Sequence, residues 1–162
     1  MMDSPKFIVC DKIEKFSKNY KFLSNFYLVT ITKDNQNWPS SEHLFQSSKT
    51  LKIEEQEKIR LEPDPGKTKK LGKNVSIRED WEEVKVRIMY DCLRMKFGQN
   101  PEISEELIKT YPMQLIEGNY WHDNFWGKCN CERCKSKEWK NILGLLLEKV
   151  RLEYIINNRR YD

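Results

Sequence analysis

The stretch EDWEEVKVRIMYDCLRMKF, residues 79–97, has the clearest helical pattern in the sequence. Its apolar residues recur at spacings of three and four, which places them on one side of a helix with about 3.6 residues per turn. This stripe consists of Trp81, Val84, Ile88, Cys92 and Met95, widened by Leu93 and Phe97. Gly98 ends the pattern. We therefore predict a helix over 79–97 that crosses the core and buries Trp81, Ile88, Cys92 and Met95.

Further helices are predicted on both sides of this one. Ser40 is a good N-cap residue for a helix that begins after Pro39, and a second helical segment ends where Pro63 and Pro65 interrupt it. The basic segment 66–74 is either a short helix or a loop. The segment that ends before Pro63 covers 54–62 and either continues the first helix or begins a new one. The other predicted helices cover 101–108 and roughly 138–156, the last with Trp139, Ile142, Leu143, Leu146, Val150 and Ile155 on one side.

The first forty residues indicate a small β element. The segments KFIVC (6–10) and FYLVTITKDNQNW (26–38) contain the β-branched and aromatic residues typical of strands. The polar run between Ile31 and Trp38 is a turn signal, so a hairpin closed by Trp38 is expected. The predicted fold class is α+β and mainly α, with residues 1–162 forming one compact helical domain and a small N-terminal hairpin or sheet.

Composition limits the class of protein. The chain has 162 residues, of which 33% are charged and 12% aromatic, values typical of a folded globular domain. No apolar run approaches the roughly 20 residues that cross a bilayer, so no membrane association is expected. No secretory signal is evident, and five cysteines favour reduced thiols in the cytoplasm. We expect a monomer. The net charge of +4 suits a phosphate-bearing ligand better than a dedicated DNA-binding role.

The segment WPSSEHLFQSSK, residues 38–49, places polar side chains beside the predicted core. At about 100° per residue, Glu42, Gln46 and Lys49 fall with Phe45 within one third of the helix circumference. A solvated lysine is the ordinary interpretation of Lys49. The alternative is a lysine at the margin of a pocket, whose pKa is lowered by partial burial so that it can act as an amine nucleophile.

The segment LIEGNYWHDNFWGKCNCERCKSK, residues 115–137, is rich in aromatic, polar and charged residues and has little periodicity. Binding and catalytic groups often collect on such loops. Glu117 and Asp123 are either ordinary loop carboxylates or general acids and bases near Trp121 and Trp126, where apolar surroundings raise a carboxyl pKa.

Three cysteines in the same segment, Cys129, Cys131 and Cys134, are one ligand short of a structural zinc site. Only the fold can bring His122, Cys10 or Cys92 to them. Free thiols are the alternative, and the sequence assigns no metal or other cofactor. With two histidines and no nucleophile-elbow pattern, a Ser-His-Asp enzyme is disfavoured, and no phosphate-binding glycine motif is present.

Several motifs together resemble the NADAR (YbiA-like) family. They are FLSNFY (22–27), WPSSEHLFQSSK (38–49), MKFGQNPEISEELIKT (95–110), WHDNFWGKC (121–129) and NILGLLLEKVR (141–151). The resemblance covers about residues 16–152. Two positions depart from the family pattern: Lys140 stands where a glycine is usual, and Leu147 replaces a methionine. Both belong to the predicted last helix or its start, so we expect altered packing rather than lost chemistry.

This resemblance implies cleavage of an N-glycosidic bond. Some members remove ADP-ribose from guanine in DNA or RNA, and others hydrolyse ribosylated aminopyrimidine phosphates of the riboflavin pathway. The resemblance implies catalytic roles for Lys49, Glu42 and Asp123. It implies that substrate is bound by Ser24, Asn25, Phe22, His43, Gln46, Trp126 and Gly127.

In both substrates the ribose C1 atom carries an exocyclic amine. A lysine amine can exchange with such a base amine and form a Schiff base, and this favours Lys49 as a covalent nucleophile. Two alternatives stay open. A two-carboxylate mechanism would use Glu42 and Asp123 with Lys49 only electrostatic, and a non-catalytic module would bind ADP-ribose without cleaving it.

Overall fold

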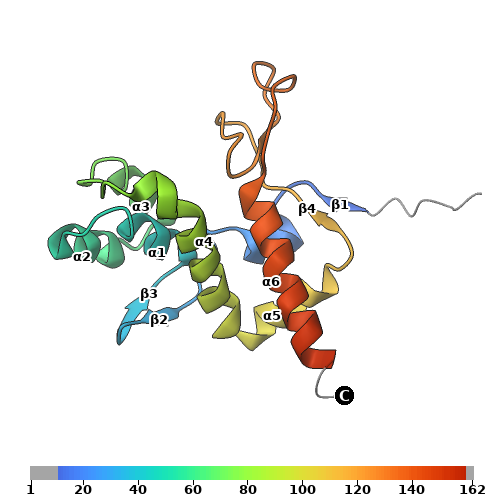
Figure 1. Cartoon of the computed structure of the whole chain (residues 1–162), viewed down its shortest axis with the longest axis horizontal. Coiled ribbons are helices and arrows are strands. Elements are labelled where there is room, and N and C mark those ends of the chain that lie inside the picture. The colour runs from blue at the N-terminus through green and yellow to red at the C-terminus, as the bar shows by residue number, and fades with distance from the viewer. Residues whose placement is uncertain (1–10, 160–162) are drawn as a thin grey trace, which may run out of the picture.

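The computed structural model describes residues 11–159, and Figure 1 shows their arrangement. The α-helices are α1 (Ser41–Ser47), α2 (Ile53–Leu61), α3 (Pro65–Leu71), α4 (Trp81–Gly98), α5 (Pro101–Lys109) and α6 (Ile142–Arg159), and a 3-10 helix covers Lys18–Leu23. The strands are β1 (Lys12–Ile13), β2 (Ile31–Lys33), β3 (Gln36–Trp38), β4 (Gln114–Leu115), β5 (Gly118–Asn119) and β6 (Lys128–Cys129). The mainly helical α+β class predicted from the sequence is confirmed.

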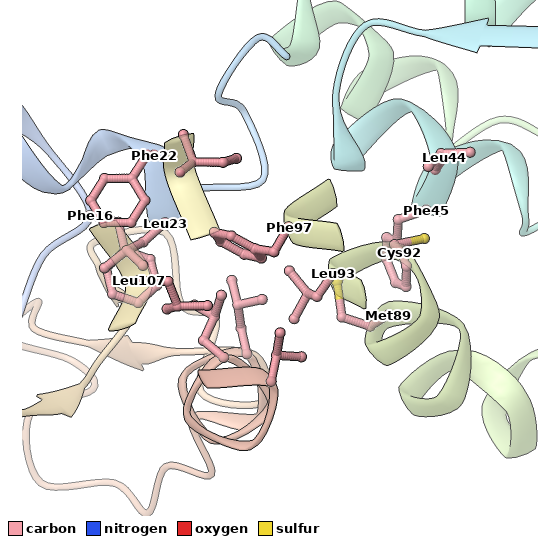
Figure 2. Packing of buried hydrophobic residues seen from close by; sticks show 14 of the residues in the cluster. Phe16, Phe22, Leu23, Leu44, Phe45, Met89, Cys92, Leu93, Phe97 and Leu107 are labelled. Atoms are coloured by element: carbon pink, nitrogen blue, oxygen red, sulfur yellow. The ribbon is translucent and has the colours of Figure 1, made fainter. Parts of the chain in front are cut away.

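Helix α4 lies at the centre of the fold and packs against α1, α5 and α6. Its Phe97 lies toward Phe22, Leu23 and Leu107, whereas Met89 and Cys92 lie on the side of Phe45 (Figure 2). Burial of these apolar side chains supplies the main favourable free energy of folding.

The predicted burial of α4 is right for Trp81 and Cys92 and wrong for Ile88 and Met95, which are half-buried. Both line a surface groove between α4, the β2–β3 hairpin and the end of α1. The helix directs Met89 and Leu93 into the core instead, because α1 and α6 both pack on that side. The apolar periodicity predicted the helix correctly, but the elements that pack on it determine which of its residues are most buried.

The small β elements differ in extent from the prediction. The hairpin is present: β2 pairs antiparallel with β3, and Ile31 lies opposite Trp38. Its turn residues Asp34 and Asn35 have φ angles of 52° and 59°, which these residue types tolerate better than most. The strand predicted over 6–10 lies outside the described residues. Strands β1 and β4 form a parallel pair, as do β5 and β6.

Two helix boundaries also differ from the prediction. Helix α6 begins at Ile142 rather than near residue 138, and Trp139 is 39% exposed in the preceding loop. Pro65 begins α3 instead of only ending α2, because Asp64 caps that helix by accepting a 2.7 Å hydrogen bond from the Lys67 amide. Among the described residues, no helix is both long and apolar enough to cross a membrane.

Candidate active site

A cavity of about 290 Å³ opens between α1, α3, α4 and the loops that follow the 3-10 helix and β4. Of the charged and polar residues that the sequence analysis proposed as catalytic or substrate-binding, all except His43 line it. The lining consists of Ser24, Asn25, Phe26, Glu42, Phe45, Gln46, Lys49, Lys69, Met89, Glu117, Trp121, Asp123, Trp126 and Leu143. Segments separated by more than a hundred residues in sequence therefore contribute to one site.

Helix α1 supplies two of the polar groups, Glu42 and Gln46, and Lys49 follows just after its end at Ser47. Ser40 caps the helix by accepting a hydrogen bond from the His43 amide. Gln46 donates a 2.7 Å hydrogen bond to Oε1 of Glu42, one turn earlier, and fixes that carboxyl group. The Glu42 amide in turn donates to the Asn25 carbonyl oxygen at 3.1 Å, which joins α1 to the loop after the 3-10 helix.

Burial moves the pKa values of Lys49 and Glu42 toward one another. Desolvation lowers the pKa of Lys49, the positive charges of Lys69 and Lys73 lower it further, and Glu42 opposes this change. Desolvation raises the pKa of Glu42, which is 5% exposed. The Lys49 Nζ atom lies 5.9 Å from the Trp81 ring centroid and 6.0 Å from that of Phe45. A larger fraction of the Lys49 side chain is therefore in the neutral amine form than would be the case in water.

The Ser24–Asn25 segment is held from several sides. The Ser41 hydroxyl donates a 3.0 Å hydrogen bond to Oδ1 of Asn25. Among residues 11–159, the Nδ2 atom of Asn25 has only the thioether of Met89, at 3.3 Å, as its acceptor. Because a thioether is a weak acceptor, this amide can donate a stronger hydrogen bond to a ligand oxygen.

The loop after β5 brings in Asp123 and Trp126. Oδ1 of Asp123 accepts hydrogen bonds from the amides of Phe125, at 3.0 Å, and Trp126, at 2.8 Å. The Trp126 indole packs edge-to-face on Phe45 with ring centroids 5.3 Å apart. The two Asp123 bonds fix the carboxylate, and the aromatic contact ties this loop to α1.

Glu117 is a site residue whose role the sequence left open. Burial raises its pKa to about 7, with further contributions from Asp123 and Glu42. Its Oε2 atom has no hydrogen-bond partner among the described residues, although it is buried. In the sequence, Glu117 is only an acidic residue that precedes a glycine in an aromatic-rich segment, and this pattern does not predict that the side chain is buried.

Lys69 was missed by the sequence reasoning. Its Nζ atom lies 5.2 Å from the ring centroid of Trp121 and 5.9 Å from that of Phe26, at the cavity. The signal was the basic segment 66–74, which becomes helix α3. Gly72 permits α3 to approach α1, because a Cβ atom at that position would lie 1.9 Å from Oε1 of Gln46.

Three residues implied by the family resemblance do not line the cavity. His43 is a fully buried residue of α1, where its Nδ1 lies 2.7 Å from the Ser40 hydroxyl and its Nε2 lies 2.6 Å from the carbonyl oxygen of Glu62, just after α2. Phe22 belongs to the hydrophobic core. At Gly127, a Cβ atom would lie 2.1 Å from the carbonyl oxygen of Glu117, so this glycine permits close packing of two loop segments.

A cluster of four possible metal ligands lies in the segment between Asn119 and Asn141, which also carries Asp123. His122, Cys129, Cys131 and Cys134 bring four ligand atoms to within 4.8 Å of one another. Of the three residues that the sequence offered as a fourth ligand, the fold thus supplies His122. Cys92 is buried in the core instead, and Cys10 lies outside the described residues.

Comparison with known proteins identifies the family. The NADAR domain matches residues 13–154, which is most of the chain. The chain belongs to the NADAR family. It is 36% identical over 142 residues to the N-glycosidase YbiA of Shigella boydii serotype 4, covering 86% of this chain and 85% of that protein.

Two further NADAR relatives extend the comparison. The Riboflavin biosynthesis protein VVA0006 of Vibrio vulnificus is 33% identical over 84% of this chain, which matches 36% of that protein. The NMR structure of the Escherichia coli protein YbiA superposes with a TM-score of 0.78 at 33% identity, covering 93% of this chain and 89% of that one. The likeness thus includes both sequence and fold.

The fold gives a structural reason for the NADAR motif around Asn141 and Gly144. The Asn141 side chain donates to the Leu115 carbonyl oxygen at 2.8 Å and accepts from the Glu117 amide at 3.0 Å. A Cβ atom at Gly144 would lie 2.0 Å from the same Leu115 oxygen. This motif therefore holds the segment that carries Glu117.

The two departures from the family pattern lie away from the cavity lining. The Lys140 amide donates a 2.8 Å hydrogen bond to the Asn124 carbonyl oxygen, and its Nζ atom lies 5.5 Å from the Phe125 ring centroid. Leu147 is fully buried in the core. Lys140 therefore contacts the loop that precedes α6, and Leu147 packs in the hydrophobic core.

Proposed function

We propose that the protein is an N-glycosidase that hydrolyses the bond between ribose C1 and an exocyclic amine, with Lys49 as a covalent nucleophile. The observation that carries this proposal is the pairing, in one cavity, of a half-buried lysine with a lowered pKa and a buried Glu42 carboxyl with a raised pKa. The names of the relatives, N-glycosidase YbiA above all, support the same bond class.

The proposed reaction begins with opening of the ribose ring. A carboxylic acid protonates the ring oxygen while the amine nitrogen forms a C=N bond to C1. The neutral Lys49 amine adds to C1, a proton moves to the base nitrogen, and the base leaves as a free amine. Water then adds to the Lys49 Schiff base and releases an aldehyde sugar, which closes to the ring form. Every step needs proton transfer by a positioned group.

Three carboxyl groups are available for these transfers. Glu42 and Glu117 have raised pKa values, which favour the protonated form that can donate to the ring oxygen. Asp123 is held by two backbone amides through Oδ1. We assign the acid role to Glu42 or Glu117 because of their raised pKa values. We assign the activation of water to Asp123 because its carboxylate is held in place by the two amides.

The surroundings of the cavity favour an ADP-ribosyl substrate. A wider groove of about 620 Å³ adjoins the cavity and shares Ser24 and Phe26 with it. Lys18 and Lys21 line this groove, and Lys69 lines the cavity. A pyrophosphate extending from the ribose would meet these positive charges, while Trp121 and Phe26 offer faces on which a base can stack. We therefore propose ADP-ribosyl-guanine in DNA or RNA as the substrate.

A second candidate substrate rests on the relatives named for riboflavin biosynthesis. A ribosylated aminopyrimidine phosphate contains the same C1–amine bond but one phosphate, and it would occupy the cavity without the groove. We propose that the enzyme acts in the cytoplasm as a monomer.

Parallel incubations test the proposal. The protein is mixed with guanine-ADP-ribosylated DNA and, separately, with the aminopyrimidine ribosyl phosphate, and the products are separated by mass. Release of ADP-ribose with restoration of unmodified guanine is the expected result. Turnover of the aminopyrimidine alone would replace the proposed substrate by the second candidate. Tight ADP-ribose binding with no turnover of either compound would indicate a non-catalytic module and contradict the proposal.

A further inference from the structure

The segment that joins β5 to α6 contains the short strand β6, and from residue 127 to 138 it has no aliphatic or aromatic side chain to hold it in place. In Figure 1 the segment drawn in orange projects beyond the N-terminal end of α6. Tyr120 and Trp121 on this loop are more than half exposed, at 63% and 58%. A loop of this length without its own hydrophobic core needs another source of order, yet it carries Asp123 and Trp126 into the active site.

Four metal-binding side chains converge within this loop. The Nδ1 atom of His122 lies 3.3 Å from Sγ of Cys131 and 3.3 Å from Sγ of Cys134. With Cys129, all four ligand atoms lie within 4.8 Å of one another. In a tetrahedral zinc site with the usual bond lengths, ligand atoms are separated by roughly 3.6–3.8 Å. The observed separations, 3.3 Å for the two His122–cysteine pairs and at most 4.8 Å within the cluster, lie on both sides of that distance.

The backbone around the cluster is already folded into a ligand-presenting turn. The amides of Cys134 and Lys135 both donate to the Cys131 carbonyl oxygen, at 3.0 and 2.9 Å, and close the C-x-x-C segment. His122 has a φ of 68°, in the left-handed region that costs energy for a residue with a Cβ atom. Cys129 is fixed by its amide, which donates to the Asn124 side chain at 2.8 Å.

The donor set distinguishes a metal site from free thiols or a disulfide. A disulfide would use two of the three sulfur atoms and leave His122 without a role in the cluster. Three thiolates and one imidazole form a complete ligand set for structural Zn²⁺ and suit soft, tetrahedral ions better than Mg²⁺ or Ca²⁺. Four protein ligands leave no open position for a reacting water, so the set fits a structural site rather than a catalytic one.

We propose that His122, Cys129, Cys131 and Cys134 bind one Zn²⁺ ion that holds the active-site loop in shape. His122 directly precedes Asp123, and Cys129 follows Trp126 by three residues, so the ion would fix both ends of the segment that enters the cavity. The metal thereby acts on the reaction only through the position of Asp123 and Trp126. This inference concerns metal binding and stands whether or not the proposed reaction is correct.

Metal analysis provides the direct test. Protein purified without chelator from zinc-containing medium should hold about one equivalent of zinc per chain. Cys131→Ser should lower both zinc content and Tm. Cys92→Ser is the matched control, because it makes the same change in a core thiol outside the cluster: it should lower Tm while zinc stays at one equivalent. Equal zinc contents in wild type and Cys131→Ser would overturn the proposal.

Variants at the fourth ligand separate metal binding from simple misfolding. His122→Cys keeps four ligands and should retain zinc, whereas His122→Ala should bind it at least tenfold more weakly. Cobalt added to the metal-free protein should give the visible absorption bands of a tetrahedral thiolate site, reduced in intensity in His122→Ala. If the metal-free protein gives no such bands and three free thiols react at this loop in the presence of zinc, the cluster is not a metal site.

Discussion

The Nζ atom of Lys96 donates a 2.8 Å hydrogen bond to the carbonyl oxygen of Ser24, which lies 72 residues earlier in the chain. Lys96 is fully buried on α4, at the centre of the fold. Burial lowers its pKa from 10.5 to about 7, against an opposing effect of Glu117. The core helix therefore holds the Ser24–Asn25 loop at the cavity through a lysine that is only partly charged at neutral pH.

This burial predicts a specific pH dependence of stability. Because the pKa of Lys96 is about 7 in the folded protein and near 10.5 in the unfolded chain, the unfolded chain binds more protons between these values. Stability should therefore rise with pH in that window. We expect the free energy of unfolding of the wild type to increase relative to that of Lys96→Met from about pH 7 to pH 10. Urea unfolding at several pH values measures it, and a constant difference would contradict the lowered pKa.

Lys49→Arg should reduce turnover by more than about a thousandfold while ADP-ribose still binds, because arginine keeps the positive charge but cannot act as an amine nucleophile. Borohydride added during turnover should reduce the Schiff base and leave a sugar adduct on the Lys49 peptide. Lys58→Arg, on the exposed side of α2, is the control and should keep the wild-type rate. If Lys49→Arg kept most of its activity, Lys49 would not be the nucleophile, and the carboxyl groups would have to carry the reaction.

Asn25→Ala should weaken ADP-ribose binding by about 1–3 kcal/mol, the cost of a lost hydrogen bond at a buried site. Calorimetric titration measures the affinity, which should also fall as salt screens the pyrophosphate charge. Asn25→Asp keeps an oxygen for the Ser41 hydroxyl but replaces the amide donor by a carboxyl group that repels a pyrophosphate, so it should lose at least as much affinity as Asn25→Ala. Unchanged binding in both variants would remove Asn25 from the ligand site.

The two sides of α4 should respond differently to a buried charge. Leu93 is fully buried, so Leu93→Asp should destabilise the protein by more than about 4 kcal/mol. Ile88 is half-buried beside the surface groove, and Ile88→Asp should cost about 1–2 kcal/mol. Chemical denaturation of the two variants checks the ranking. Equal losses of unfolding free energy in the two variants would mean that Ile88 is as inaccessible to water as Leu93.

Local pattern was sufficient for the elements that depend on nearby residues. The 3.6-residue stripe from Trp81 onward specified α4, the Ser40 cap specified the start of α1, and the Asp34–Asn35 turn specified the hairpin. Helix geometry also predicted that Glu42, Gln46 and Lys49 share one side, and all three line the cavity although α1 ends at Ser47. These features follow from backbone hydrogen bonding and side-chain direction over a few residues.

Tertiary packing decided what sequence spacing could not. It chose Met89 over Ile88 as the deepest side of α4, moved the start of α6 to Ile142 and turned His43 away from the cavity. It also buried Glu117 and Lys96 and brought His122 to three cysteines. Burial, pKa and ligand geometry depend on which distant segments meet, because desolvation and coordination are properties of a whole environment rather than of any one stretch of chain.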